Sequence, residues 1–147
     1  MAISIVDMFS IGIGPSSSHT VGPMKAALRF LTSYQRSLEL SKIDSLQIEL
    51  YGSLGHTGKG HGSDKAVILG LMGEQPEDIE PDTVAQKILA IESSGILNIL
   101  GIHSIKFNTN RDIIFHRRKS LPKHPNGMQF TAFDVHHNLI FTKIYYS

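Results

Sequence analysis

Two short segments concentrate the residues that could do chemistry. The first spans residues 12–23, between two Gly-Pro pairs, and its polar residues are Ser16, Ser17, Ser18, His19 and Thr20. The second spans residues 52–64, with five glycines, two histidines and a Ser63-Asp64 end. Each segment leads into a helix-like apolar pattern. Hydroxyls, imidazoles and bare backbone N–H groups ahead of a helix N-terminus suit an anion such as a carboxylate.

Other interpretations of the two segments are weaker or stay open. Both could be turns whose hydroxyls cap the next helix, because Ser and Thr favour N-caps. A Walker loop is disfavoured because Lys59 is followed by glycine rather than Ser or Thr. A dinucleotide-binding loop is disfavoured because Gly12 and Gly14 are not followed by the third glycine of that motif. A metal site of His19, His56 and His61 has no H-E-x-x-H pattern, and a Ser–His hydrolase has no G-x-S-x-G motif.

Five further histidines lie in or beside the β-like last third of the chain. We expect them to be surface or turn residues rather than ligands. They are His103, His116, His124, His136 and His137.

Helical periodicity and strand alternation indicate the elements that position the two segments. Apolar residues at three- and four-residue spacing predict a helix over Pro23–Tyr34, with the proline in its first turn. Alternation predicts a half-buried strand over Asp44–Tyr51. The glycines of residues 52–64 predict mostly irregular structure there. A second helix is predicted over Lys65–Met72, capped by Ser63 or Asp64 and closed by Gly73.

A third helix is predicted from Asp82 or Thr83, as its cap, to Gly95. Its inner side is expected to carry Val84, Ile88, Leu89 and Ile91. The run Ile96–Ile102 is ambiguous between a helical turn and a strand. Two hairpins are predicted after it. The first joins residues 104–108 to 112–116, and the second joins residues 128–135 to 139–146 through His136-His137-Asn138.

The order α-β-α-α-β-β-β-β indicates an α+β fold. We expect residues 1–147 to form one domain whose helices pack on one face of a mixed, mostly antiparallel sheet. A formal charge of +1 gives no reason to expect nucleic acid. No apolar run nears the roughly 20 residues of a membrane span, and no signal peptide is evident. The absence of cysteine excludes disulfides and Cys-ligated metals on this chain and is compatible with a cytoplasmic location.

Residues 4–24 and 52–66 closely resemble the iron–sulfur-dependent L-serine dehydratases. The resemblance spans essentially the whole chain but covers only that family's β domain, which is fused to or associated with a helical α domain. It implies conversion of L-serine to pyruvate and ammonia. It also implies a [4Fe-4S] cluster, held in the α domain by three cysteines, whose open iron acts as a Lewis acid. Because this chain has no cysteine, we expect it to be inactive alone.

The resemblance also implies roles for the two segments. His61 is the preferred base for the α-proton, because a neutral imidazole suits proton transfer near neutral pH. His19 is the other histidine that carries over, and His61 could instead be a capping or turn residue. The residues expected to hold the substrate are Ser16, Ser17, Ser18, His19, Thr20, Gly60 and Asp64.

A second resemblance leads to a rival function. The chain is similar to the intermediate domain of some phosphoglycerate dehydrogenases, which implies a serine- or anion-binding regulatory module without chemistry of its own. An apolar surface left by the α domain would favour self-association, so we also expect a homo-oligomer.

Overall fold

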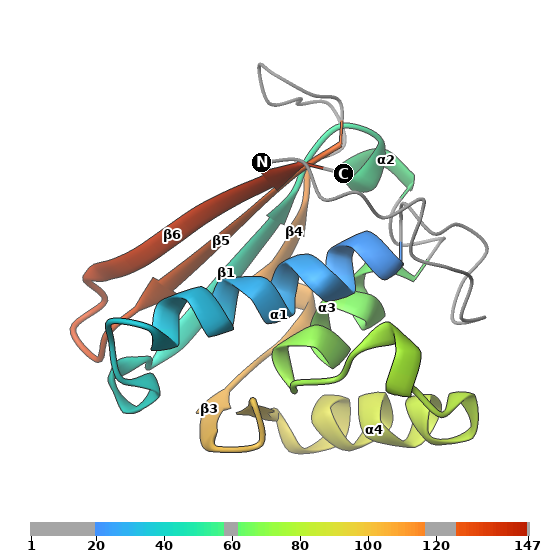
Figure 1. Cartoon of the computed structure of the whole chain (residues 1–147), viewed down its shortest axis with the longest axis horizontal. Coiled ribbons are helices and arrows are strands. Elements are labelled where there is room, and N and C mark those ends of the chain that lie inside the picture. The colour runs from blue at the N-terminus through green and yellow to red at the C-terminus, as the bar shows by residue number, and fades with distance from the viewer. Residues whose placement is uncertain (1–19, 58–61, 117–125, 147) are drawn as a thin grey trace.

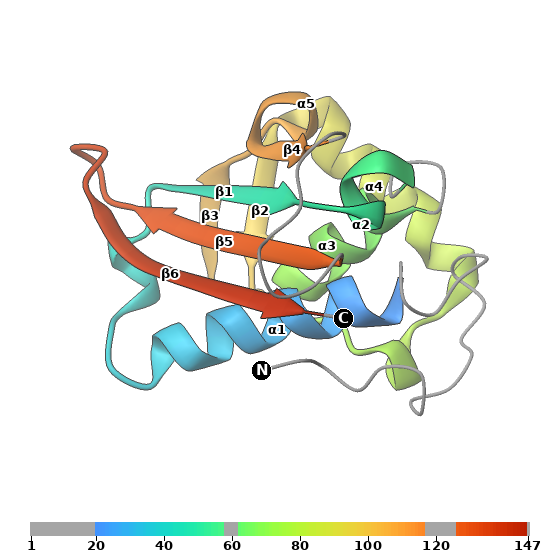
Figure 2. The same cartoon turned by 90° about the horizontal axis from the view of Figure 1, so that it is seen from above.

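A four-stranded sheet covered on one face by helices forms the body of the molecule. The computed structural model describes residues 20–57, 62–116 and 126–146. Helices α1 (Val21–Gln35) and α3 (Ser63–Leu71) lie beneath one face of the sheet, and α4 (Pro81–Ser94) lies beyond α3 (Figures 1 and 2). This arrangement confirms the predicted α+β class, with helices on one face.

The sheet is mixed and mostly antiparallel, as predicted. Its strand order is β4-β1-β5-β6. Strand β1 (Ser45–Leu50) pairs antiparallel with β5 (Gly127–Phe133), which pairs antiparallel with β6 (Leu139–Tyr146). On its other side β1 pairs parallel with the short β4 (Ile113–Phe115).

Strand β1 shows the predicted alternation. Leu46, Ile48 and Leu50 are buried against the helices, whereas Gln47 and Glu49 are half-buried on the opposite face. Because side chains of successive residues point to opposite faces, this pattern fixes which side of the sheet meets the helices.

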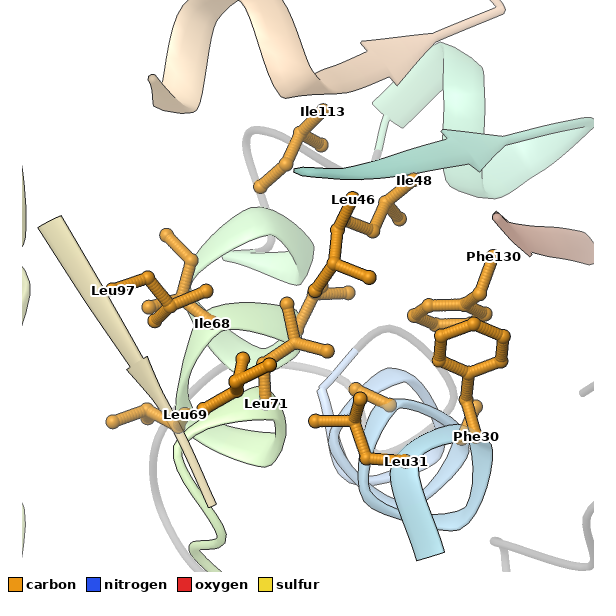
Figure 3. Packing of buried hydrophobic residues seen from close by; sticks show 14 of the residues in the cluster. Phe30, Leu31, Leu46, Ile48, Ile68, Leu69, Leu71, Leu97, Ile113 and Phe130 are labelled. Atoms are coloured by element: carbon orange, nitrogen blue, oxygen red, sulfur yellow. The ribbon is translucent and has the colours of Figure 1, made fainter. Parts of the chain in front are cut away.

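Helix α1 begins close to the predicted position, with Pro23 in its first turn. Its buried stripe faces the sheet, where the Phe30 ring stacks on Phe130 with centroids 5.4 Å apart (Figure 3). Leu31 lies on the same helix near the leucines of α3 (Figure 3). Aromatic stacking therefore joins α1 to the sheet, and leucines lie between α1 and α3.

The starts of α3 and α4 differ from prediction. Neither Ser63 nor Asp64 is the N-cap of α3; Gly62 is, with a φ of 80° that glycine adopts without strain. Helix α4 begins earlier than expected, because Pro81 suits the first helical position and Glu80 becomes the N-cap.

The ends of α3 and α4 match prediction, but one inner residue of α4 does not. Gly73 follows α3 with a φ of 98°, and Gly95 is the C-cap of α4 with a φ of 70°. Leu89 was predicted to face inward but is 62% exposed. It lies outside the buried stripe of α4, in which Ile88 and Ile91 contact the core.

The ambiguous run after α4 is a strand, β2 (Ile96–Ile99), which pairs antiparallel with β3 (His103–Lys106). The predicted hairpin of residues 104–108 and 112–116 is therefore wrong. Asn108 instead caps a short helix, α5 (Thr109–Asp112), by accepting hydrogen bonds from the backbone N–H groups of the next turn. This helical turn breaks the hairpin and takes the chain to β4, in the main sheet.

The second predicted hairpin is confirmed as β5 and β6. The Asp134 side chain holds its turn by accepting hydrogen bonds from the backbone N–H groups of Asn138, at 2.8 Å, and His136, at 2.9 Å. These two hydrogen bonds keep the pKa of Asp134 below its usual value, and the bond from Asn138 has the larger effect.

A one-turn helix, α2 (Ser53–Thr57), follows β1 directly, although the glycines there predicted irregular structure. Gly52 has a φ of 65° and permits the turn into it. Two 3₁₀ turns complete the described elements, η2 (Leu40–Lys42) and η3 (Pro76–Asp78). Within the described ranges no helix combines the length and apolar character that crossing a membrane requires.

Candidate active site

The described parts of the two polar segments lie at one end of the molecule. Figures 1 and 2 show α2 and the first turns of α1 and α3 at the same end, toward which β1 runs. Helices α1 and α3 are in close contact: a Cβ on Gly70 would lie 2.2 Å from the Met24 carbonyl oxygen. Two helix N-termini at one end provide partial positive charge for an anion.

Thr20 is the N-cap residue of α1 and is 2% exposed. Its carbonyl oxygen accepts the hydrogen bond of the Met24 N–H at 3.1 Å, but its side chain makes no capping hydrogen bond. The interpretation of the first segment as a hydroxyl cap is therefore not supported at this residue.

Asp64 lies in the first turn of α3 and is half-buried. Its Oδ1 atom is shielded from solvent and has no hydrogen-bond partner among the residues that the structure describes. A buried carboxylate oxygen without a partner is costly, so this atom is well suited to a cationic or N–H-bearing ligand.

The remaining predicted site residues lie outside the described ranges. They are Ser16, Ser17, Ser18, His19, Gly60 and His61. Their predicted roles stay predictions, as does the weaker three-histidine metal site.

A second polar cluster lies on the sheet face opposite the helices, at the end of β1. His116 Nε2 is 2.9 Å from Glu49 Oε1, and the two side chains are only 18% and 19% exposed. The Tyr51 hydroxyl donates to the same Glu49 oxygen at 3.1 Å, and its ring stacks on that of His116 with centroids 4.4 Å apart. Burial first, then the Glu49 charge and hydrogen bond, raise the pKa of Tyr51 to about 12.

Sequence reasoning missed this cluster. His116 was predicted to be a surface or turn residue, and only its place at the end of β4, beside β1, brings it to Glu49. His103 is half-buried, and its Nε2 lies 2.8 Å from the Ile43 carbonyl oxygen. The prediction is confirmed for His136 and His137, which are exposed in the β5–β6 turn. His124 lies outside the described residues.

A cleft of about 630 Å³ opens at the end of the sheet where β1 begins, opposite the end where Glu49 and His116 lie. Lys42 and Lys106 line it together with Asp44, Asp134 and His103. The cleft thus offers both positive and negative side chains.

No group of three potential metal ligands occurs in residues 20–57, 62–116 or 126–146. The whole sequence also lacks cysteine. The residues present therefore do not fit the ligand set of an iron–sulfur cluster, which cysteine thiolates bind.

Comparison with protein families assigns the chain as a whole. A family model described as the serine dehydratase beta chain matches residues 4–147. The chain belongs to this family. The matched region includes both polar segments, residues 12–23 and 52–64.

Curated relatives agree with the family. The L-serine dehydratase of Streptomyces coelicolor is 50% identical over all 147 residues. That of Mycobacterium tuberculosis is 45% identical over the same length, and L-serine dehydratase TdcG of Escherichia coli is 44% identical over 99% of the chain. In each comparison the chain covers 32% of the relative's length. It thus spans about a third of these enzymes.

Proposed function

We propose that this chain is the β domain of an L-serine dehydratase that converts L-serine to pyruvate and ammonia. The observation that carries the proposal is the 50% identity, over the whole chain, to an enzyme named L-serine dehydratase. The chain would form one wall of an active site that a second, helical α domain completes.

The proposed reaction is a β-elimination. The α-proton goes to a base, the electrons of the Cα–H bond form the Cα–Cβ double bond, and hydroxide leaves from Cβ. The resulting 2-aminoacrylate tautomerises to an imine, which water hydrolyses to pyruvate and ammonia. His61 is the proposed base, with His19 as the other candidate, because a neutral imidazole titrates near pH 6.5 and accepts protons at neutral pH.

The same end of the molecule offers complementary charge to a zwitterionic amino acid. The N-termini of α1 and α3 favour the substrate carboxylate. Asp64 Oδ1, which has no partner within the described residues, could accept a hydrogen bond from the ammonium group. The other proposed substrate contacts are Ser16, Ser17, Ser18, Thr20 and Gly60.

The [4Fe-4S] cluster expected from the resemblance has no cysteine ligands on this chain, because the chain contains no cysteine. We therefore assign the cluster to the α domain, and no step described above is routed through it.

The test replaces His61 in the full-length enzyme. His61→Ala should lower kcat by about 10²- to 10⁴-fold at unchanged cluster content, because the base is lost. His137→Asn is the matched control. His137 stacks on Phe133 in the β5–β6 turn, which lies at the opposite end of the sheet from α2 (Figures 1 and 2). A His61→Ala enzyme with an intact cluster and wild-type kcat would exclude His61 as the base.

The cleft at the start of β1 favours the regulatory function as a second candidate. Its lysines suit the carboxylate and its aspartates the ammonium of serine or a similar amino acid. Calorimetric titration of serine into the inactive His61→Ala enzyme should then show a second binding event that Lys106→Ala removes. Identical heats with and without Lys106 would rule out the cleft.

A further inference from the structure

The Glu49–His116 pair is linked to α2 through the main chain of His116. The His116 N–H donates to the Leu50 carbonyl oxygen at 2.8 Å, which extends the β1–β4 pairing past the last residue of β4. On its other side the His116 carbonyl oxygen lies against Gly55 of α2. A Cβ on Gly55 would come 2.2 Å from that oxygen, so α2 packs directly on the His116 backbone.

The side chains of the cluster fix the orientation of this backbone. Glu49 Oε1 receives both the His116 ring nitrogen and the Tyr51 hydroxyl, so one oxygen ties the residue after β4 to the residue after β1. A second tie holds α2 itself, since the Ser53 hydroxyl donates to the Asn126 side chain.

Stability alone is a weak reason for such a pair. Desolvation offsets most of the attraction within a half-buried ion pair, and apolar residues of similar size often stabilise a fold as well or better. What the pair adds is direction, because hydrogen bonds to one carboxylate oxygen hold two side chains in a defined geometry.

We propose that Glu49 and His116 are positioning residues that hold α2 in the place the reaction requires. The proposal rests on the proposed function. In the sequence, α2 ends four residues before His61, the proposed base. An error of about 1 Å in the placement of a reacting group can cost about 10²-fold in rate, so a shift of α2 should reduce turnover more than substrate binding.

The experiment compares His116→Ala, His116→Gln and His137→Asn in the full-length enzyme with its cofactor. The glutamine amide nitrogen can replace Nε2 as donor to Glu49, whereas alanine cannot. His137→Asn removes another stacked ring, centroids 4.4 Å from Phe133, and asparagine tolerates the φ of 63° there. Melting temperature and cluster content are measured for each variant.

His116→Ala should lower kcat by about 10- to 100-fold with KM within about twofold, and His116→Gln should recover most of the loss. His137→Asn should keep wild-type kcat. A wild-type kcat in His116→Ala, or equal losses in the alanine and glutamine variants, would overturn the positioning role. If the positioning role fails in this way while His61→Ala is inactive in the same assay, the proposed function still holds. If the wild-type enzyme does not consume serine, the proposed function itself fails.

Discussion

At the scale of single residues, one carboxylate oxygen organises the polar face of the sheet. Glu49 Oε1 accepts from Tyr51 and is paired with His116, in a setting where both members of the pair are largely shielded from water. Removing Glu49 would leave both the Tyr51 hydroxyl and the His116 ring nitrogen without this acceptor, whereas removing either of those two leaves the other bond to Oε1 in place.

Tyr51→Phe tests the hydrogen bond through its pH dependence. Folding raises the pKa of Tyr51 from 10.0 to about 12, so the folded state favours the neutral phenol. Its contribution to stability is complete below pH 10 and is lost as the pH rises through 12. The variant should be less stable by about 1 kcal/mol at pH 9, and the difference should shrink by pH 11.5. Denaturant unfolding at both pH values measures it; a constant difference would contradict the assignment.

Asp64→Asn separates binding from stability at the candidate site. The charge near the N-terminus of α3 contributes only about 0.3–1 kcal/mol, and the buried Oδ1 opposes it, so stability should change by less than about 1 kcal/mol. In the full-length enzyme KM for serine should rise about tenfold, as expected for a lost charge-assisted hydrogen bond to the ammonium. Steady-state kinetics with a parallel melt provide the measurement. An unchanged KM would exclude Asp64 as a contact of the substrate ammonium group.

At the scale of elements, the sequence predicted correctly those elements whose pattern lies within a few neighbouring residues. The apolar stripe of α1, the alternation of β1 and the turn between β5 and β6 all lie within short windows, and each is confirmed. The cap at Asn108 was missed because it competes with a strand pattern that continues on both sides of it. Its side chain decided in favour of a helical turn.

The parallel partner of β1 could not be predicted from such windows. The pairing of Glu49 with His116 depends on the register between β1 and β4. In the described chain these strands are separated by four α-helices, a 3₁₀ turn and a small hairpin. The candidate site was located only as two sequence segments for the same reason, because the meeting of α1 and α3 depends on long-range packing.

Gly70→Ala tests the contact between α1 and α3. The new Cβ would lie 2.2 Å from the Met24 carbonyl oxygen and 2.9 Å from Ala27 Cβ, so the helices must separate. We expect a loss of about 2–3 kcal/mol, larger than the gain in helix propensity.

Gly95→Ala is the matched control for that substitution. Its Cβ would meet no atom within 4 Å, but its φ is 70°. The cost should be the strain of a left-handed alanine alone, about 1–2 kcal/mol. Chemical denaturation of the two variants compares them, and a Gly70→Ala chain as stable as wild type would argue against close helix packing.

At the scale of the whole molecule, the chain has a core of its own but spans only about a third of the length of its named relatives. Its buried residues form one cluster shared by the sheet and the helices. The isolated chain should therefore fold but form no pyruvate from serine under anaerobic conditions. A coupled pyruvate assay checks this, with the full-length enzyme as positive control, and turnover by the chain alone would contradict the need for an α domain.

The interior place of β1 in the sheet has a consequence for biosynthesis. Ile48 pairs with Ile113 on one side and with Phe130 on the other, so neither partner exists when β1 leaves the ribosome. Contacts between residues far apart in sequence form late because closing the intervening loop costs entropy. Until Ile113 and Phe130 have been synthesised, the nascent chain therefore exposes an apolar strand with two open edges, and we expect this stage to be prone to aggregation and to depend on chaperones.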